Sequence, residues 1–143
     1  MSRLQSPSLH LLAKNDLAEI GRIAAVIDKF CADRGLGDET AHAVNLVLDE
    51  LLTNTISYGY ADAAGHVIDI ALTLSRESLT VTIRDDAVAF DPTTAATPDL
   101  DAEIDERPIG GLGIHFVRTI MDKIEYRRVS GYNELTLTKF LKS

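Results

Sequence analysis

Hydrophobic side chains recur at helical spacing near the start of the chain. Between residues 16 and 34 they fall three or four positions apart, as on one face of a helix: Ile20, Ile23, Ala24, Ile27 and Phe30. Asp16 is followed three residues later by Glu19, a pattern typical of a capping box at a helix start. Gly35 and Gly37 then indicate the end of this helix.

A second amphipathic segment covers about residues 39–58. Its apolar face consists of Ala41, Val44, Leu48, Leu51 and Leu52. Asp38 precedes the segment, where an N-cap residue is expected. Gly59 follows it, where glycine commonly ends a helix. We therefore predict a second helix directly after the first.

Alternation of apolar and polar residues predicts strands on both sides of this helical pair. Residues 3–12 are partly alternating and predict an edge strand. Residues 66–75 and 78–85 predict two strands, and the alternation of Leu79, Val81 and Ile83 with polar neighbours is typical of a half-buried strand. The break at residues 76–78 predicts a hairpin turn between them.

Periodicity is lost between about residues 87 and 110, which we interpret as a lid. Eight acidic residues and no Lys or Arg lie between Asp85 and Glu106. A loop of this length in a small domain is commonly a lid or disordered. A third helix at about 111–123 and strands at about 124–130 and 133–141 complete the chain. The expected fold is a single-domain (1–143) α/β (α+β) two-layer sandwich, a mostly antiparallel mixed sheet with helices on one face.

Charge and composition exclude several classes of function. The 143 residues carry 14 basic and 22 acidic side chains, for a net charge of −8. This balance disfavours a broad electrostatic grip on nucleic acid or an anionic membrane, although backbone N–H groups still allow a small anionic ligand. Cys31 is the single cysteine, so an intramolecular disulfide and a four-cysteine zinc site are impossible. With no signal-peptide or membrane-spanning pattern, we expect a cytoplasmic protein.

Glu50 and Asn54 are the first candidate chemical pair. Four residues apart in the second helix, they lie on one face, while the neighbouring leucines point toward the core. A carboxylate and an amide oxygen so placed suit a hard cation such as Mg²⁺, or the orientation of a nucleophile. Because such pairs are common on helices, a solvated helix face is the alternative.

Two further segments have the chemistry of a nucleotide site. Asp85 ends a predicted strand, where its carboxylate can accept a hydrogen bond from an exocyclic amine such as that of adenine. Small residues follow it and let a planar ligand approach the backbone. Gly110, Gly111 and Gly113 open the third helix, where free N–H groups and the helix dipole favour phosphate. A strand-to-loop exit and a flexible hinge are the alternatives.

These three segments, in this order, resemble the motifs of the GHKL (histidine-kinase-like) ATPase superfamily. Within it the chain is similar to anti-sigma regulatory factors with serine/threonine-protein kinase activity. Residues 50–54 resemble the N box, residues 85–92 the first glycine box and residues 110–114 the second. The resemblance covers about residues 10–142 and implies an ATP-binding fold.

The resemblance also implies a role for each matching residue. Asn54 would coordinate Mg²⁺, and Glu50 would be the catalytic general base. Asp85 would bind the adenine amino group of ATP or ADP, supported by Thr136 from the last strand. The remaining nucleotide contacts would come from the two glycine boxes: Ala87, Ala89, Gly110, Gly111, Leu112 and Gly113.

The implied partners are a sigma factor and a STAS-domain anti-anti-sigma factor, on which a serine would be phosphorylated; a homodimer is also compatible with the family. A non-catalytic module, in which nucleotide binding switches a protein interface, is the alternative function. The chain departs from the family pattern at two places. Ala87 and Ala89 replace the usual glycines of the first box, and Tyr58 stands where a basic residue often follows the N-box asparagine.

Overall fold

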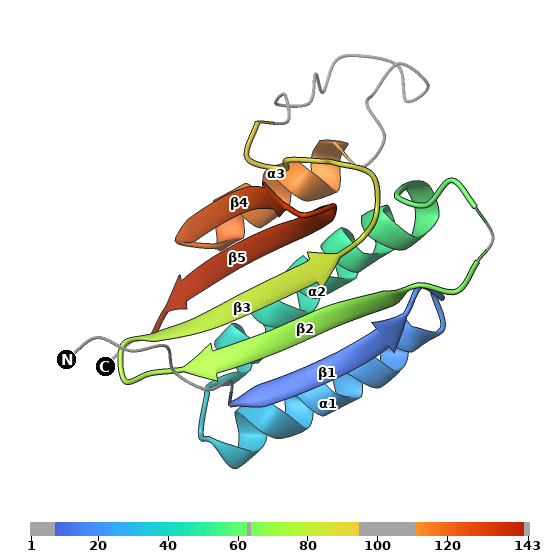
Figure 1. Cartoon of the computed structure of the whole chain (residues 1–143). Coiled ribbons are helices and arrows are strands. Elements are labelled where there is room, and N and C mark those ends of the chain that lie inside the picture. Colours follow the sequence, from blue (N-terminus) through green and yellow to red (C-terminus); the bar gives the residue numbers. More distant parts are fainter. Residues whose placement is uncertain (1–7, 63, 95–110, 142–143) are drawn as a thin grey trace.

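A computed structural model of the chain describes residues 8–62, 64–94 and 111–141, with the backbone alone in 111–115. Within these residues, five strands and three helices follow one another as the sequence patterns predict (Figure 1). The elements are β1 (Leu9–Lys14), α1 (Glu19–Asp33), α2 (Asp38–Tyr58), β2 (Val67–Leu74), β3 (Ser78–Asp85), α3 (Gly111–Ile120), β4 (Lys123–Val129) and β5 (Tyr132–Phe140).

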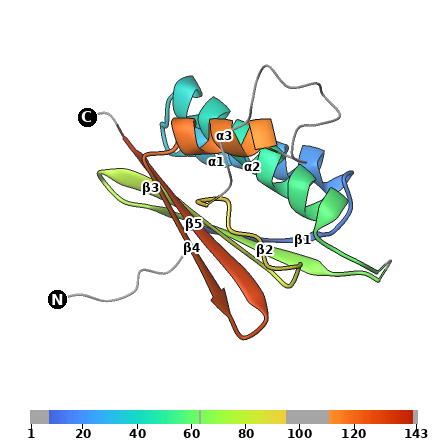
Figure 2. The same ribbon diagram turned by 90° about the horizontal axis from the view of Figure 1, so that it is seen from above.

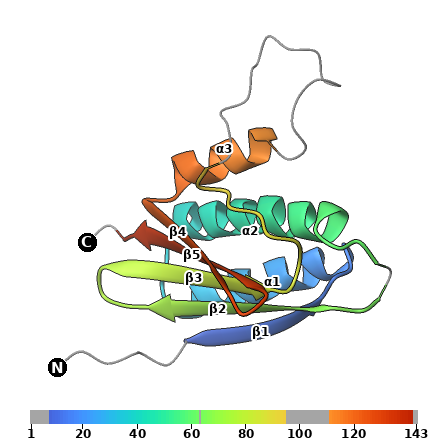
Figure 3. The ribbon, with the colours of Figure 1, turned by 45° about the horizontal axis from the view of Figure 1, so that its top comes forward.

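The strands form one sheet in the order β1-β2-β3-β5-β4. Each neighbouring pair of strands is antiparallel, so the sheet lacks the parallel pairing that a mixed sheet would have. All three helices cover the same face (Figure 2), and α2 packs between α1 and α3 (Figure 3). The predicted two-layer architecture is therefore confirmed.

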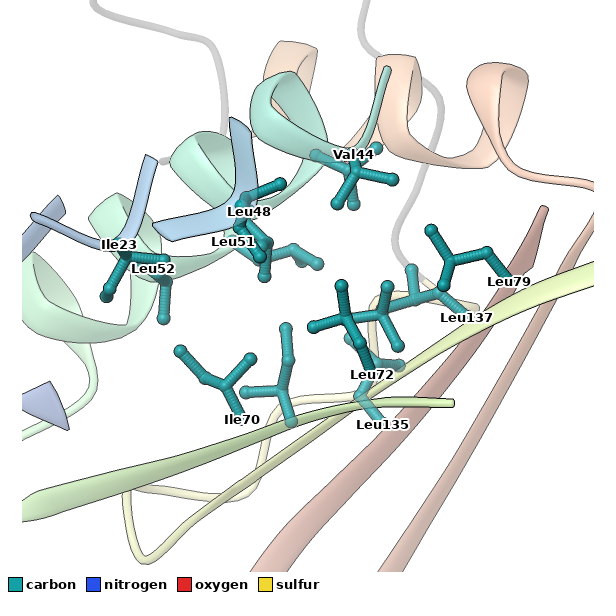
Figure 4. Packing of buried hydrophobic residues seen from close by; sticks show 14 of the residues in the cluster. Ile23, Val44, Leu48, Leu51, Leu52, Ile70, Leu72, Leu79, Leu135 and Leu137 are labelled. Atoms are coloured by element: carbon teal, nitrogen blue, oxygen red, sulfur yellow. The ribbon is translucent and has the colours of Figure 1, made fainter. Parts of the chain in front are cut away.

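The core lies between the helices and the inward face of the sheet (Figure 4). The predicted alternation of β3 is confirmed, since Leu79, Val81 and Ile83 are buried beneath the helices. Branched aliphatic side chains fill most of this layer, among them Ile23, Ile27, Val44, Leu48, Leu52, Ile70, Leu72 and Leu137. This packing fixes α2 over the central strands.

The first helix begins later than the capping-box pattern predicts. Its N-cap residue is Ala18, with no side-chain cap, and α1 starts at Glu19. The Asp16 carboxylate accepts a hydrogen bond from the Ala18 N–H before the helix begins, and the Glu19 carboxylate accepts one from the Lys14 N–H. The two acids therefore order the β1–α1 turn instead of forming a capping box.

Other element ends differ by a few residues from the prediction. Gly37, not Asp38, is the N-cap residue of α2, whereas Gly59 is its C-cap residue as expected. α3 ends at Ile120, three residues early. The β4–β5 turn is centred on Ser130 and Gly131, which both have positive φ. Of the predicted lid, residues 95–110 lie outside the described part of the chain.

We expect Leu137→Ala to reduce the free energy of unfolding by about 2–5 kcal/mol, because truncating a fully buried leucine leaves a cavity. Leu137 is completely buried on β5, next to the central strand β3. Leu12→Ala is the matched control, since Leu12 is 58% exposed on β1, and it should change stability by less than about 0.5 kcal/mol. Urea unfolding measures both variants, and equal losses would contradict this description of the core.

Candidate functional site

A pocket opens between α2 and the ends of β3, β4 and β5. Its volume is about 260 Å³. Apolar and aromatic side chains form most of its walls. Polar residues also line it from different elements, among them Asn54 of α2, Asp85 of β3 and Asn133 of β5. A mostly apolar cavity with a few convergent polar groups is the usual form of a small-molecule site.

Asp85 is the last residue of β3 and only 5% exposed. Burial raises the pKa of its carboxyl group, while hydrogen bonds from Asn133 and from the Ala87 N–H act in the opposite direction. Within the described residues, both hydrogen bonds fall on Oδ1, at 2.9 and 3.1 Å. The second oxygen, Oδ2, therefore remains as an acceptor for a ligand N–H.

The two alanines of the first glycine box both line the pocket. Neither has a positive φ, so glycine is not needed at either position to avoid backbone strain. The small residue that matters is Gly59 on the facing side, where an added Cβ would lie 2.9 Å from the Ala87 methyl carbon. In addition, the Gly59 carbonyl accepts a hydrogen bond from the Val88 N–H. The end of α2 is thus joined directly to the loop after Asp85.

The N-box residues lie one turn apart on α2. Asn54 lines the pocket, next to Leu51 and Tyr58 of the same helix. Glu50 is half-buried but does not contribute to the pocket lining. Tyr58, at the position where the family often has a basic residue, is 57% exposed at the pocket rim. The described part of the chain therefore brings Asn54, but not Glu50, to the pocket itself.

The second glycine box lies partly in the described chain. Gly110 is outside it, while Gly111, Leu112 and Gly113 form the N-terminal turn of α3. This end of α3 points toward the end of the molecule at which β3 finishes (Figures 1 and 3). The helix terminus that is predicted to bind phosphate is thus at the same end of the fold as Asp85.

Thr136 does not reach the pocket. It alternates along β5 with Leu135 and Leu137, whose side chains are buried under the helices. It pairs with Thr82 and Glu125, on the face that no helix covers. The expected support of Asp85 by Thr136 is therefore corrected.

Asn133 takes this position instead, a residue that the motif did not indicate. It is 8% exposed and donates a hydrogen bond to Asp85. Asn133 lies two residues before Leu135 on β5, so its side chain points to the same buried face of the sheet. A polar residue at such a buried position indicates a functional or structural role, and the sequence contains this signal. The prediction followed the threonine of the motif and did not apply the two-residue period of the strand.

Outside the pocket, His66 is held by two carboxylates and links the loop after α2 to the residue next to Asp85. His66 Nε2 lies 2.8 Å from Asp62 Oδ1, and Nδ1 lies 3.1 Å from Asp86 Oδ2. The Tyr60 ring stacks on the imidazole at 4.4 Å between centroids. The hydrogen bonds to Asp62 and then Asp86 raise the pKa of His66. The loop after α2 is thereby tied to the residue that follows Asp85.

The stability of the protein should depend on pH through His66. A raised folded-state pKa means that the stabilisation is complete below the unfolded value of about 6.5 and is lost as pH rises through the folded pKa. We expect His66→Gln to lower the Tm most at the acidic end of this range, with a difference that shrinks toward alkaline pH. Thermal unfolding across pH measures it, and His42→Gln, on the exposed surface of α2, is the control. A difference that does not vary with pH would contradict the assignment.

The described residues contain no group of three His, Cys, Asp or Glu side chains that could hold a metal ion by itself. Mg²⁺ in phosphoryl-transfer sites usually keeps several waters and binds one or two protein oxygens plus substrate phosphates. Asn54 lines the pocket and can offer one amide oxygen, and the N-terminus of α3 lies at the same end of the fold, so these residues fit this chemistry. None of the described helices has the length and apolar character that crossing a membrane requires.

Comparison with known proteins agrees with this geometry. The chain is 34% identical over 95 residues to the serine/threonine-protein kinase BtrW of Bordetella bronchiseptica, covering 66% of this chain and 67% of the relative. It is 22% identical over 138 residues to the serine-protein kinase RsbW of Listeria monocytogenes, covering 94% and 86%. Both relatives are named as protein kinases.

Two solved structures share the fold. The histidine kinase domain of a blue-light activated histidine kinase from Erythrobacter litoralis superposes with a TM-score of 0.54 and 23% identity, covering 87% of this chain. The RsbU and RsbW domains of a Mycobacterium tuberculosis protein give a TM-score of 0.63 and 15% identity, covering 99%. This chain spans 60% and 34% of the lengths of those two chains. Because residues 13–139 match the family described as the histidine kinase-like ATPase domain, the chain belongs to that family.

Proposed function

We propose that the chain binds Mg·ATP in this pocket and acts as a serine/threonine protein kinase of the anti-sigma type. Its substrate would be a serine of a STAS-domain anti-anti-sigma protein, and it would also sequester a sigma factor. The observation that carries the proposal is the buried carboxylate of Asp85, which lines a mostly apolar pocket and whose hydrogen bonds within the described chain fall on Oδ1, with Oδ2 left for a ligand. The relatives named as serine-protein kinases support the class of reaction.

The nucleotide would lie with its base against Asp85 and its phosphates toward α3. The exocyclic amine of adenine would donate to Asp85 Oδ2, between the side chains of Ile83 and Leu135 and the aromatic ring of Tyr126. Gly110, Gly111 and Gly113 would supply backbone N–H groups to the phosphates. Asn54 would hold Mg²⁺, which neutralises phosphate charge and helps to position the transferred group.

Glu50 is the proposed general base of the transfer. The serine oxygen would attack the γ-phosphorus while its proton passes to the Glu50 carboxylate, and the bond to the bridging oxygen would break to release ADP. Phosphoryl transfer requires mainly positioning and charge stabilisation, so one carboxylate beside the phosphate end suffices. Glu50 lies one turn from Asn54 on α2 but outside the pocket lining. The nucleotide would therefore occupy the pocket, and the serine hydroxyl would approach Glu50 from outside it.

One observation favours a second function. Because Glu50 does not line the pocket, nucleotide binding does not require it, and the same site could serve a non-catalytic module in which nucleotide switches a protein interface. The two functions share the nucleotide contacts and differ in whether phosphate is transferred.

The experiment is incubation of the protein with Mg·ATP and a candidate STAS-domain partner, followed by mass spectrometry of the partner. We expect a single phosphoserine on the partner and release of one ADP per phosphate. Nucleotide-dependent binding of the partner without phosphoserine would support the switching module instead. A control with the serine of the partner changed to alanine shows whether the transfer is site-specific.

A further inference from the structure

Asn133 makes an unusually complete set of contacts for a residue at a pocket wall. Its Nδ2 donates to Asp85 Oδ1 at 2.9 Å, to the Val88 carbonyl at 2.9 Å and to the Ala87 carbonyl at 3.3 Å. Its Oδ1 accepts from the Tyr126 hydroxyl at 2.5 Å and from the Phe90 N–H at 3.3 Å. One side chain on β5 thus joins β3, β4 and the loop after β3.

These contacts allow only one orientation of the amide. Rotating it by half a turn would place its oxygen against a carboxylate and two carbonyl oxygens, and its NH₂ against the Phe90 N–H. The Phe90 N–H and the acceptor oxygens around Nδ2 therefore fix the amide so that its NH₂ faces Asp85, and the Tyr126 hydroxyl donates to its oxygen. Since both atoms of the amide are fully engaged, Asn133 has no hydrogen-bonding capacity left for a ligand.

These contacts determine which hydrogen bonds the Asp85 carboxylate can make. The Asn133 NH₂ and the Ala87 N–H are both donors, so Oδ1 of the carboxylate must be an acceptor. Donors on a buried carboxylate favour its charged form and oppose the effect of burial on its pKa. With Oδ1 used in this way, Oδ2 is the oxygen that remains for a ligand.

We propose that Asn133, oriented by Phe90 and Tyr126, is a positioning residue that occupies Oδ1 of Asp85 and leaves Oδ2 to accept from the N–H donor of the bound base. This inference rests on the proposed nucleotide function and adds a specificity element to it. A base that presents an amine toward Oδ2 is accepted, and a base that presents a carbonyl oxygen there is rejected, because two acceptors would then face each other in a buried site.

Arg128 completes the support of the loop. Its Nη1 donates to the Ala87 carbonyl at 2.8 Å, and its charge lowers the pKa of Asp85. The other titratable groups that act on or near this carboxylate are Asp86, which raises its pKa, and the hydroxyls of Tyr60 and Tyr126. None of these groups donates a hydrogen bond to Asp85, so the Asn133 amide is the side chain that sets its orientation.

The test uses the isosteric variant Asn133→Asp. It keeps the acceptor for Tyr126 and Phe90 but loses the donor to Asp85, and it places two carboxylates side by side. Such a pair binds a proton more tightly than either group alone. At low pH the introduced carboxyl can be protonated and can donate to Asp85 in place of the amide; at high pH both groups are charged and repel each other.

We expect calorimetric titration to show ADP binding weakened at least about tenfold at alkaline pH by Asn133→Asp, with recovery as the pH falls. The wild-type affinity should change little over the same interval. A merely structural role would give a pH-independent loss. Wild-type affinity and an unchanged pH profile in this variant would overturn the inference.

A second measurement separates this inference from the proposed function. Carboxyl NMR of the ligand-free protein gives the pKa of Asp85 in the wild type and in Asn133→Ala. We expect a higher pKa in the variant because the donor is gone, and an unchanged pKa would overturn the inference whether or not nucleotide binds. Absence of ADP binding by the wild type, with the pKa raised in the variant, would instead refute the proposed function and the assignment of the base as the ligand of Oδ2.

Discussion

Replacing Glu50 by glutamine should lower the rate of phosphoryl transfer to the partner by about 100- to 10,000-fold, the usual contribution of a general base. Glutamine has nearly the same size and the same place on α2, but it cannot accept the proton of the attacking serine. Because Glu50 is half-buried outside the pocket lining, the affinity for ADP should stay within about twofold of the wild type. Single-turnover kinetics and calorimetry measure the two quantities separately.

Asp49→Asn is the matched control for this experiment. Asp49 is the preceding residue of α2, but it is exposed on the side of the helix that faces α1, where its carboxylate accepts a hydrogen bond from the Thr53 hydroxyl. Its replacement removes the same charge and should leave the transfer rate unchanged. If Glu50→Gln transferred phosphate at the wild-type rate, Glu50 would not be the base.

Replacing Asp85 by asparagine should weaken ADP binding by about 10- to 150-fold, the value of a buried hydrogen bond to a charged group. The introduced amide oxygen can still accept from Asn133 and from the Ala87 N–H, which turns the introduced NH₂ toward the pocket. A donor would then face the amine of adenine. In the same variant, a base with a carbonyl oxygen at this position would accept a hydrogen bond from the introduced NH₂.

Competition between ADP and inosine diphosphate therefore measures the base preference of each protein, because both nucleotides carry the same ribose and phosphates. The wild type should prefer ADP, and Asp85→Asn should lose most or all of that preference. Asp86→Asn removes an equal charge one residue away, outside the pocket lining, and should retain the preference for ADP. If Asp85→Asn bound both nucleotides with wild-type selectivity, the carboxylate would not contact the base.

The fold was predictable from the sequence because its elements have strong periods. The apolar stripes of α1 and α2 and the alternation of β3 predicted these elements in the correct order. They also predicted that the helices form one layer and the strands the other. Their ends were predicted less well, because local hydrogen bonds decide them. Asp16 shows this clearly, since its side chain satisfies the Ala18 N–H in the turn before α1 rather than capping the helix.

The candidate site was predictable where a motif coincided with a clear element. Asn54 and Asp85 lie on a long helix and at the end of a regular strand, and the structure brings both to one pocket. Thr136 and Asn133 could not be told apart by motif alone, whereas the two-residue period of β5 separates them, since Asn133 shares a face with Leu135 and Leu137. The role of Gly59 likewise depends on Ala87, a residue 28 positions later that only tertiary packing places beside it.

Calorimetric titration of the protein with ADP in the presence of Mg²⁺, alongside Asn54→Ala, tests the central claim most directly. If the helix, the strand end and the glycine-rich turn surround one magnesium-bound adenine nucleotide, the wild type binds one ADP per chain with a micromolar to sub-millimolar Kd. Removal of the Asn54 amide should then abolish the part of the affinity that depends on Mg²⁺. No measurable heat with the wild type at millimolar ADP, or an unchanged magnesium dependence in Asn54→Ala, would contradict the account.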